Sequence, residues 1–408
     1  MTTHLTPQRE RWLLLTLASI QFTSVLDFMI MMPLGPQLTG LFGISASQFG
    51  FLVSAYTFSA GLSGFLAATY VDRFGRKRMM LTLYSLFGLA AVACSFAPSF
   101  AWLMAARVAS GFFGGVLMAL SQTIVAEVVP YERRGRAMSL VMTSFSVATV
   151  AGVPLALFLV AQFNWHAPFL AIAAMVTVFA VVASQTLPSL KGHVQTHADG
   201  GTARAIVANL RAVLVDPNHL RAFAMSASMV FAGFAVIPYI TLYLQANAGF
   251  QSSEIPYVYL FGGVSTLLTA RWIGHWSDRA GKAYAFRRLA LLMPLPLLGM
   301  TLSAALPMAG VLVVSSLLFV VMSGRMIPGM ALIGASADPQ RRGSFMTLNA
   351  AVQSLAMGLA ALVGGLILGR DSNGQLTLYW VSALVGGCAS VLSFALSSRL
   401  RLHGAAAQ

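Results

Sequence analysis

The sequence predicts an all-α membrane protein with twelve transmembrane helices. Of its 408 residues, 58% are hydrophobic and only 9% are charged, whereas soluble domains carry about 25% charged residues. The apolar residues form continuous runs of about 20 residues, the length that a helix needs to cross the hydrocarbon core. A transmembrane β-barrel would instead alternate polar and apolar residues over short strands. The runs therefore predict membrane-spanning helices.

The runs fall into two groups of six, separated by a polar segment. That segment, residues 188–219, has no sustained apolar stretch and predicts a cytoplasmic linker. We therefore expect an N-terminal six-helix bundle over 1–187 and a C-terminal one over 220–408. The first six helices are expected near 12–34, 49–71, 79–97, 101–125, 136–161 and 167–187. The second six are expected near 220–244, 255–274, 286–305, 310–334, 344–369 and 376–398.

The basic residues predict the orientation of these helices. The net charge of +14 could suggest nucleic acid binding, but the charges lie in short tracts between the apolar runs. With both termini in the cytoplasm, 22 of the 25 Lys and Arg residues fall on the cytoplasmic side. Cytoplasmic loops carry such an excess in membrane proteins. We expect cytoplasmic termini, a location in the cell (inner or plasma) membrane, and no nucleic acid partner.

Two short motifs recur in both halves at nearly the same offset. Asp72-Arg73-Phe74-Gly75-Arg76 corresponds to Asp278-Arg279-Ala280-Gly281-Lys282, and Pro130 to Gly135 corresponds to Pro339 to Gly343. Secondary transporters often contain internal repeats with the substrate site between them, near the bilayer midplane. The repeats therefore indicate a duplicated membrane carrier.

The first of these motifs resembles the loop between the second and third helices of the major facilitator superfamily. The family pattern is Gly-x-x-x-Asp-Arg-x-Gly-Arg-Lys, and this sequence matches it from Asp72 to Lys77, with Ala68 in place of the first Gly. The second copy keeps the leading Gly as Gly274. Together with the twelve runs and the linker, the resemblance covers the whole chain and implies a fold of two pseudo-symmetric six-helix bundles.

The same motif predicts a conformational latch. Asp72 lies at the C-terminal end of a helix, where the helix dipole disfavours an acid, so it needs basic neighbours. Charge pairs there could hold the two halves together in the outward-facing state, although these residues could also serve only to orient the helices. The expected latch residues are Asp72, Arg73, Gly75, Arg76, Arg133, Arg134, Asp278 and Arg279.

Three charged residues interrupt apolar runs, where each is costly unless it is paired or faces water. Asp27 lies in the first run, Arg107 in the fourth and Arg325 in the tenth. A carboxyl group in this setting can cycle protons, and a nearby Arg could control it, so Asp27 and Arg107 are the predicted proton-coupling residues. The alternative is a permanent ion pair that only fixes helix packing. Arg107 with Gly111 also resembles the family's fourth-helix Arg-x-x-x-Gly pattern.

Other residues bear on the direction of transport and on the substrate. Gly152-Val153-Pro154-Leu155 resembles a degenerate form of the fifth-helix motif of drug:proton antiporters and sugar efflux permeases, which implies export. Soft and aromatic side chains would suit amphipathic compounds. The expected cavity residues are Met29, Met31, Met32, Tyr56, Tyr239, Tyr243 and Arg325.

These observations predict a monomeric secondary active transporter for proton-coupled efflux of small lipophilic or amphipathic compounds by alternating access. A proton symporter or uniporter for a sugar or organic acid is an alternative, as is a non-transporting membrane sensor. No nucleophile–base pair, nucleotide-binding loop or metal-ligand spacing is present in the sequence, and Cys94 and Cys388 are isolated. We therefore expect no enzyme activity, no cofactor and no metal; the expected partners are the substrate, protons and lipid.

Overall fold

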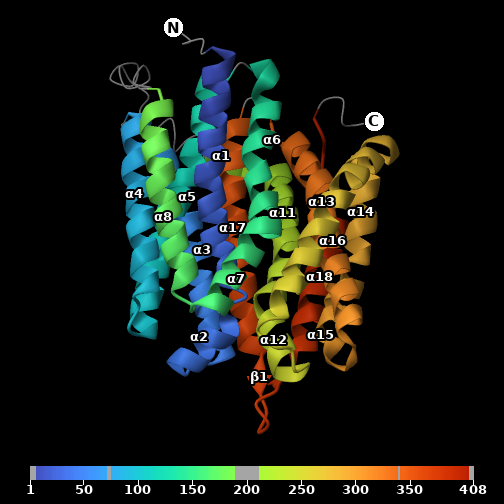
Figure 1. Ribbon diagram of the computed structural model, residues 1–408. Coiled ribbons are helices and arrows are strands. Elements are labelled where there is room, and N and C mark those ends of the chain that lie inside the picture. The colour runs from blue at the N-terminus through green and yellow to red at the C-terminus, as the bar shows by residue number, and fades with distance from the viewer. Residues whose placement is uncertain (1–5, 71–74, 130, 189–210, 339–340, 404–408) are drawn as a thin grey trace. The chain divides into compact units, whose positions relative to one another are not determined.

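The protein is almost entirely helical in the computed structural model, which describes residues 6–70, 75–129, 131–188, 211–338 and 341–403. Within this part, the only β-structure is a short antiparallel hairpin of β1 (Gly369–Arg370) and β2 (Leu376–Thr377). Figure 1 shows the long helices that make up the rest. The chain divides into two compact units, which are described separately below.

Unit 1 comprises Met1–Ile30 and Phe58–Ile206. Within it α1 packs against α5, α6 and α8, and α4 packs against α5 and α8. Ser99 begins α5 by accepting a hydrogen bond from the N–H of Trp102, which satisfies one of the free donors of the first turn. Its helices are α1 (Pro7–Ile30), the second half of α3 (Ala46–Tyr70), α4 (Arg76–Ser95), α5 (Phe100–Val128), α6 (Tyr131–Val147), the π-helix η2 (Ala148–Gly152), α7 (Val153–Gln162) and α8 (Ala167–Thr186).

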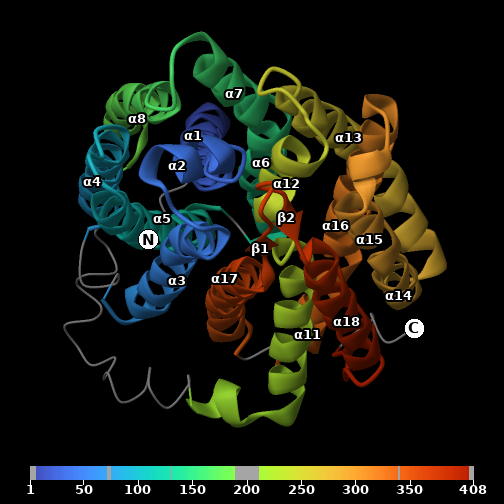
Figure 2. The same ribbon diagram turned by 90° about the horizontal axis from the view of Figure 1, so that it is seen from below.

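Unit 2 comprises Met31–Thr57 and Val207–Gln408. Here α11 packs against α16, α17 and α18, while α16 packs against α13 and α14 (Figure 2). Its helices are α2 (Gly35–Phe42), the first half of α3, α11 (Pro217–Phe234), η4 (Ile237–Tyr239), α12 (Ile240–Asn247), α13 (Ile255–Ala280), α14 (Lys282–Leu292), α15 (Pro294–Thr301), η5 (Ser303–Ala305), α16 (Met308–Ser336), α17 (Arg342–Ile367) and α18 (Tyr379–Ser397).

The units differ in one respect from the domains expected from the sequence. Residues 31–57, which include the end of the first expected helix, the segment after it and the start of the second, group with unit 2. In this segment Gly35 lies against Leu242 of α12, and the ring of Phe49 packs edge-on against Tyr239. Most of the predicted linker, 189–210, lies outside the described residues, so the boundaries at 187 and 220 stay predictions.

Each of the twelve predicted runs coincides with helix in the described residues. Ten helices there are long and apolar enough to cross a membrane. The eighth and ninth predicted runs are not among these ten helices. The last ten residues of α13 include Arg271, His275, Asp278 and Arg279, and the ninth run is divided between α14 and α15.

Several predicted helices are interrupted where the sequence contains proline. The first run ends its helix at Ile30, before Pro33, and continues as α2 with Pro36 near its start. The seventh changes to a 3-10 turn at Pro238, and the ninth is broken at Pro294. Proline has no N–H to donate and its ring clashes with the preceding turn. The apolar runs therefore predicted the positions of the helices correctly but did not predict where proline interrupts them.

Small residues bring α3 and α5 into direct backbone contact in unit 1. A Cβ atom added to Gly115 would lie 2.3 Å from the carbonyl oxygen of Ala60 and 2.7 Å from its Cα. Nearby, the hydroxyl of Ser59 donates a hydrogen bond of 2.7 Å to the carbonyl of Val108. Membrane helices associate through such small-residue contacts and polar bonds, since lipid supplies no hydrophobic drive between them.

Gly115→Val is therefore expected to destabilise unit 1, because a side chain at this position must force α3 and α5 apart. Overpacking typically costs about 1–3 kcal/mol. Thermal unfolding of the purified protein in detergent should show a lower midpoint. Gly274→Ala is the matched control, since nothing lies within 4 Å of its added Cβ. Equal midpoints for the two variants would contradict the contact.

Candidate functional site

A buried ion pair lies inside unit 1. Asp27 of α1 and Arg107 of α5 are both 0% exposed, and Nη1 of Arg107 donates to Oδ2 of Asp27 at 2.7 Å. The other carboxylate oxygen, Oδ1, has no hydrogen-bond partner among the described residues. A charge pair inside a low-dielectric span interacts strongly, but each ion loses its hydration. The structure thus brings together the two residues that the sequence singled out for proton coupling.

Further polar side chains surround this pair. One turn before Asp27, the hydroxyl of Thr23 lies 2.9 Å from the hydroxyl of Tyr84 on α4. Sγ of Cys94, also on α4, lies 3.9 Å from the hydroxyl of Ser110 on α5. All four side chains are buried. Sequence reasoning missed Thr23, Tyr84 and Ser110, although the four-residue spacing of Thr23 and Asp27 places both on one helix face.

The fifth-helix motif lies against the same helix, α1. Residues 148–152 form a π-helix, and α7 begins immediately after it with Pro154 in its first turn. A Cβ added to Gly152 would lie 2.9 Å from Leu26. The hydroxyl of Thr149 lies 3.5 Å from Sδ of Met29, a predicted cavity residue. Gly152 therefore lies in close contact with α1, and the link of Gly152 and Pro154 to antiport stays a prediction.

Arg325 of α16 is also 0% exposed but has a different environment. Its Nη2 donates to the carbonyl of Met229 at 2.6 Å and its Nη1 to the hydroxyl of Ser390 at 3.0 Å. That hydroxyl donates in turn to the carbonyl of Ala290. The described residues contain no carboxylate in contact with this guanidinium. Arg325 thus cross-links α16 to α11 and α18 through neutral groups.

The other predicted cavity residues lie in unit 2 and are buried. Met31 and Met32 follow α1, and Tyr56 lies in the first half of α3. Tyr239 donates from its hydroxyl to the carbonyl of Ala361, and the ring of Tyr243 lies 4.8 Å from that of Tyr379. The two tyrosines take part in helix packing within unit 2. A role in lining a cavity stays a prediction for the whole set.

The latch residues are described only in part. Asp72 and Arg73 lie outside the described residues, as does the side chain of Arg134, while Gly75 directly precedes α4. Arg76 is 2% exposed and pairs with Glu127 at the end of α5, at 2.6 Å from Nη2 to Oε1. Sequence reasoning did not identify Glu127 as the partner of Arg76.

The remaining latch residues are exposed. Arg133 pairs with Glu10 of α1 at 3.0 Å from Nη2 to Oε2. Asp278 and Arg279, the second copy of the motif, form no ion pair with any described residue. A latching role stays a prediction for all eight residues.

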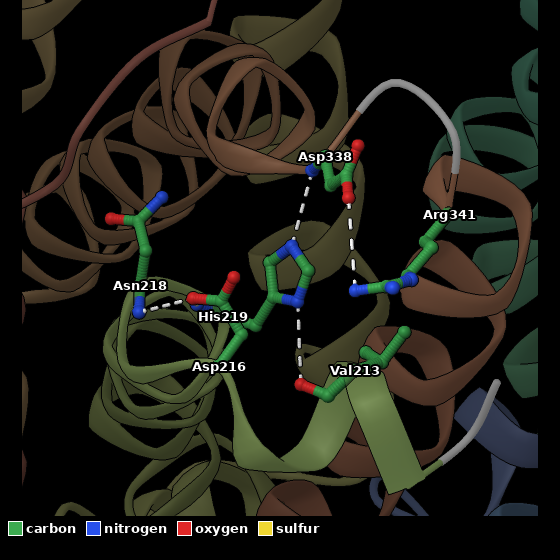
Figure 3. A network of polar contacts seen from close by, with 6 residues as sticks. All are labelled: Val213, Asp216, Asn218, His219, Asp338 and Arg341. Atoms are coloured by element: carbon green, nitrogen blue, oxygen red, sulfur yellow. Dashed lines mark hydrogen bonds and ion pairs between the residues drawn. The ribbon is translucent and has the colours of Figure 1, made fainter. Parts of the chain in front are cut away.

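A second polar network ties the start of α11 to the end of α16 in unit 2 (Figure 3). His219 is buried, and its Nε2 accepts a bond of 3.1 Å from the backbone N–H of Asp338. Its Nδ1 must therefore carry the hydrogen that is directed at the carbonyl of Val213, 3.3 Å away. Arg341 lies 3.8 Å from the carboxylate of Asp338. This network fixes one tautomer of a neutral imidazole.

Asp216 caps the same end of α11. Its Oδ1 accepts from the backbone N–H groups of Asn218 at 2.7 Å and His219 at 3.3 Å. Partial burial acts to raise the pKa of the Asp216 carboxyl, but the hydrogen bonds from these N–H groups outweigh it and lower the pKa. The cap is thus stabilised in its ionised form, as expected at a helix N-terminus.

Long apolar helices with a buried carboxylate–guanidinium pair between two of them are typical of a multi-pass membrane protein. The sequence matches the Major Facilitator Superfamily over residues 17–327, and the chain belongs to that family. This confirms the resemblance and the fold class that the motifs predicted. Members of the family are non-enzymatic carriers that bind small molecules.

Relatives and solved structures agree with this assignment. The chain is 26% identical over 378 residues to an uncharacterised MFS-type transporter, YtbD, of Bacillus subtilis (strain 168), covering 91% of this chain and 92% of the relative. It is 26% identical over 362 residues to a chloramphenicol resistance protein of Streptomyces lividans, covering 88% and 89%.

Two solved structures share the fold. The D-xylose-proton symporter matches with a TM-score of 0.76 at 17% identity, over 96% of this chain and 97% of that chain. A bacterial homologue of the human lysosomal transporter Spinster matches with a TM-score of 0.73 at 16% identity, over 97% and 98%.

Removing either partner of the buried pair should be more damaging than removing both. Asp27→Asn and Arg107→Met each leave one ionisable group buried without its counter-ion, which typically costs about 3–5 kcal/mol. In the double variant both groups are gone. Thermal unfolding in detergent is expected to rank the double variant above both single variants. Additive losses would contradict a direct coupling between these residues.

His219→Phe should weaken the junction between α11 and α16. Phenylalanine can keep the ring packing against Phe345, whose centroid lies 4.9 Å from that of His219, but both hydrogen bonds are lost. Leaving buried backbone groups unsatisfied costs about 1–3 kcal/mol, so the unfolding midpoint should fall. His275→Phe is the matched control, because His275 is exposed and its ring is hydrogen-bonded to the carbonyl of Arg271 in its own helix. No difference between the variants would refute the junction.

Proposed function

We propose that the protein is a proton-coupled antiporter that exports small lipophilic or amphipathic compounds by alternating access. The observation that carries the proposal is the Asp27–Arg107 pair at 2.7 Å, with both side chains fully buried. A carboxylate is the one member of this pair that can change its charge in the accessible pH range, since guanidinium remains protonated.

Protonation of Asp27 would break the ionic contact and leave Arg107 without its counter-ion. A substrate, water or a movement of α5 would then have to stabilise the guanidinium, and loss of the proton would restore the pair. A ligand or proton shifts a conformational equilibrium only through such a difference in interaction between states. This exchange is the proposed link between proton movement and transport.

Two further observations support export. The Gly152–Pro154 segment lies against α1 beside Asp27's neighbour Leu26. One relative of similar length is named a chloramphenicol resistance protein, which favours efflux of a small amphipathic drug. We further propose that the carrier acts as a monomer in the plasma membrane with both termini in the cytoplasm, because 22 of its 25 basic residues would then lie on that side.

The test is proton flux in everted membrane vesicles that respiration has loaded with protons. Chloramphenicol and a panel of lipophilic cations should each be offered; a transported compound should release luminal protons and acidify the exterior. Asp27→Asn should abolish this release, because the amide cannot carry a proton. Asp371→Asn, which changes an exposed acid of the β1–β2 hairpin, should behave as wild type.

Gradient-dependent release that survives in Asp27→Asn would exclude this carboxyl as the coupling group. Uptake of D-xylose or an organic acid into right-side-out vesicles, driven by an inward proton gradient, would instead establish the symporter. Either result overturns the proposal.

A further inference from the structure

A ladder of aromatic rings lies on an exposed face of α13 and α14. The rings of Trp272 and Trp276 are stacked at 6.5 Å, and Trp276 meets Tyr284 of α14 edge-on at 6.3 Å. The guanidinium of Arg288 lies 5.0 Å from the centre of the Tyr284 ring. Trp272 is 70% exposed and Tyr284 is 48% exposed. The row of rings therefore ends beside a cation, and its two outer rings are exposed while Trp276 between them is partly buried.

The turn between the two helices brings these residues together. Gly281 ends α13 and begins α14 with φ of 91°, a conformation that favours glycine. Trp272 lies 17 residues after Ile255, or about 26 Å along the helix at 1.5 Å per residue. A helix that starts at one membrane surface therefore places Trp272 and Trp276 near the opposite edge of a hydrocarbon core of about 30 Å. Trp and Tyr prefer that depth.

Basic side chains flank the ladder without acidic partners. Arg271, Arg279, Lys282 and Arg288 are exposed, and none forms an ion pair with a described residue. Asp278 is the one acid in the sequence between 271 and 288. Arg279 lies three residues after Trp276, on the same helix face. Local charge is thus strongly positive at the depth where lipid headgroups lie.

We propose that this basic–aromatic surface, formed by Arg271, Trp272, Trp276, Arg279, Tyr284 and Arg288, binds the headgroup of an anionic phospholipid. The phosphate and its negative charge complement the guanidinium groups. The rings provide an amphipathic platform for the glycerol and the first acyl carbons. A soluble anion would leave the exposed rings without a partner, and a zwitterionic lipid would not complement the excess of positive charge.

The test is titration of the purified full-length protein in detergent with phosphatidylglycerol, with bound lipid counted by native mass spectrometry. Each removed surface charge weakens anionic lipid binding about fivefold, so Arg279→Gln/Arg288→Gln should weaken it roughly twenty-five-fold. Both side chains are exposed, so folding should not be affected. Arg370→Gln, an exposed arginine in β1, is the control and should retain wild-type binding.

Further measurements distinguish binding of a lipid headgroup from binding of free phosphate. Trp272→Ala/Tyr284→Ala should also weaken phosphatidylglycerol binding while leaving the charge unchanged, and phosphatidylcholine should bind weakly to all variants. The proposal fails if the double arginine variant binds phosphatidylglycerol as tightly as Arg370→Gln. It also fails if inorganic phosphate at millimolar concentration displaces the lipid, or if phosphatidylcholine binds equally well.

Discussion

The free-energy cost of placing charge in hydrocarbon determines where almost every charged residue of this protein lies. A charged group inside a span costs several kcal/mol unless a partner compensates it. Asp27 and Arg107 compensate each other, and Arg325 is bonded to a backbone carbonyl and a hydroxyl. In the sequence, the remaining basic residues lie near the ends of the apolar runs or between the runs, where water and headgroups are expected. The same constraint therefore shapes both the topology and the candidate site.

The two buried arginines show that the internal repeat preserves helix length but not charge. Helices α5 and α16 are each 29 residues long and follow corresponding positions of the repeat. Arg107 is the eighth residue of α5, whereas Arg325 is the eighteenth residue of α16. The ten-residue difference corresponds to about 15 Å along the helix. Arg107 is paired with a carboxylate, whereas the hydrogen-bond partners of Arg325 among the described residues are neutral groups that cannot titrate.

The sequence predicted the spans well because apolar length is a local property. Every expected run coincides with helix, and the proline residues that interrupt three of them are visible in the sequence. Which side chains become neighbours in the folded protein is not a local property of the sequence. Periodicity could place Asp27 and Arg107 inside the membrane, but only the packing of α1 against α5 makes them neighbours. For the same reason Glu127 was not recognised as the partner of Arg76, and Tyr84 was not recognised beside Thr23.

The predicted cavity tyrosines illustrate a second limit of sequence reasoning. Tyr239 contacts a seam of glycines: a Cβ added to Gly50 or Gly365 would lie within about 2.5 Å of its hydroxyl oxygen. The phenol fills the space that these glycines leave and donates to the carbonyl of Ala361. An aromatic ring in an apolar span can therefore serve packing as readily as ligand contact. Composition alone does not distinguish these uses, since both need a large ring with a satisfied hydroxyl.

Helix α1 connects the titratable carboxyl to the irregular part of unit 1. Thr23 and Asp27 form one stripe of α1, which faces Tyr84 of α4 and Arg107 of α5. Leu26 and Met29 belong to the neighbouring stripe, which contacts Gly152 and Thr149 of the π-helix η2. Single-turn π-helices inside α-helices are rare and occur frequently at functional sites. A displacement of α1 that follows a change in the charge of Asp27 would reach η2 through Leu26 and Met29. These contacts with η2 lie within one turn of Asp27 along α1.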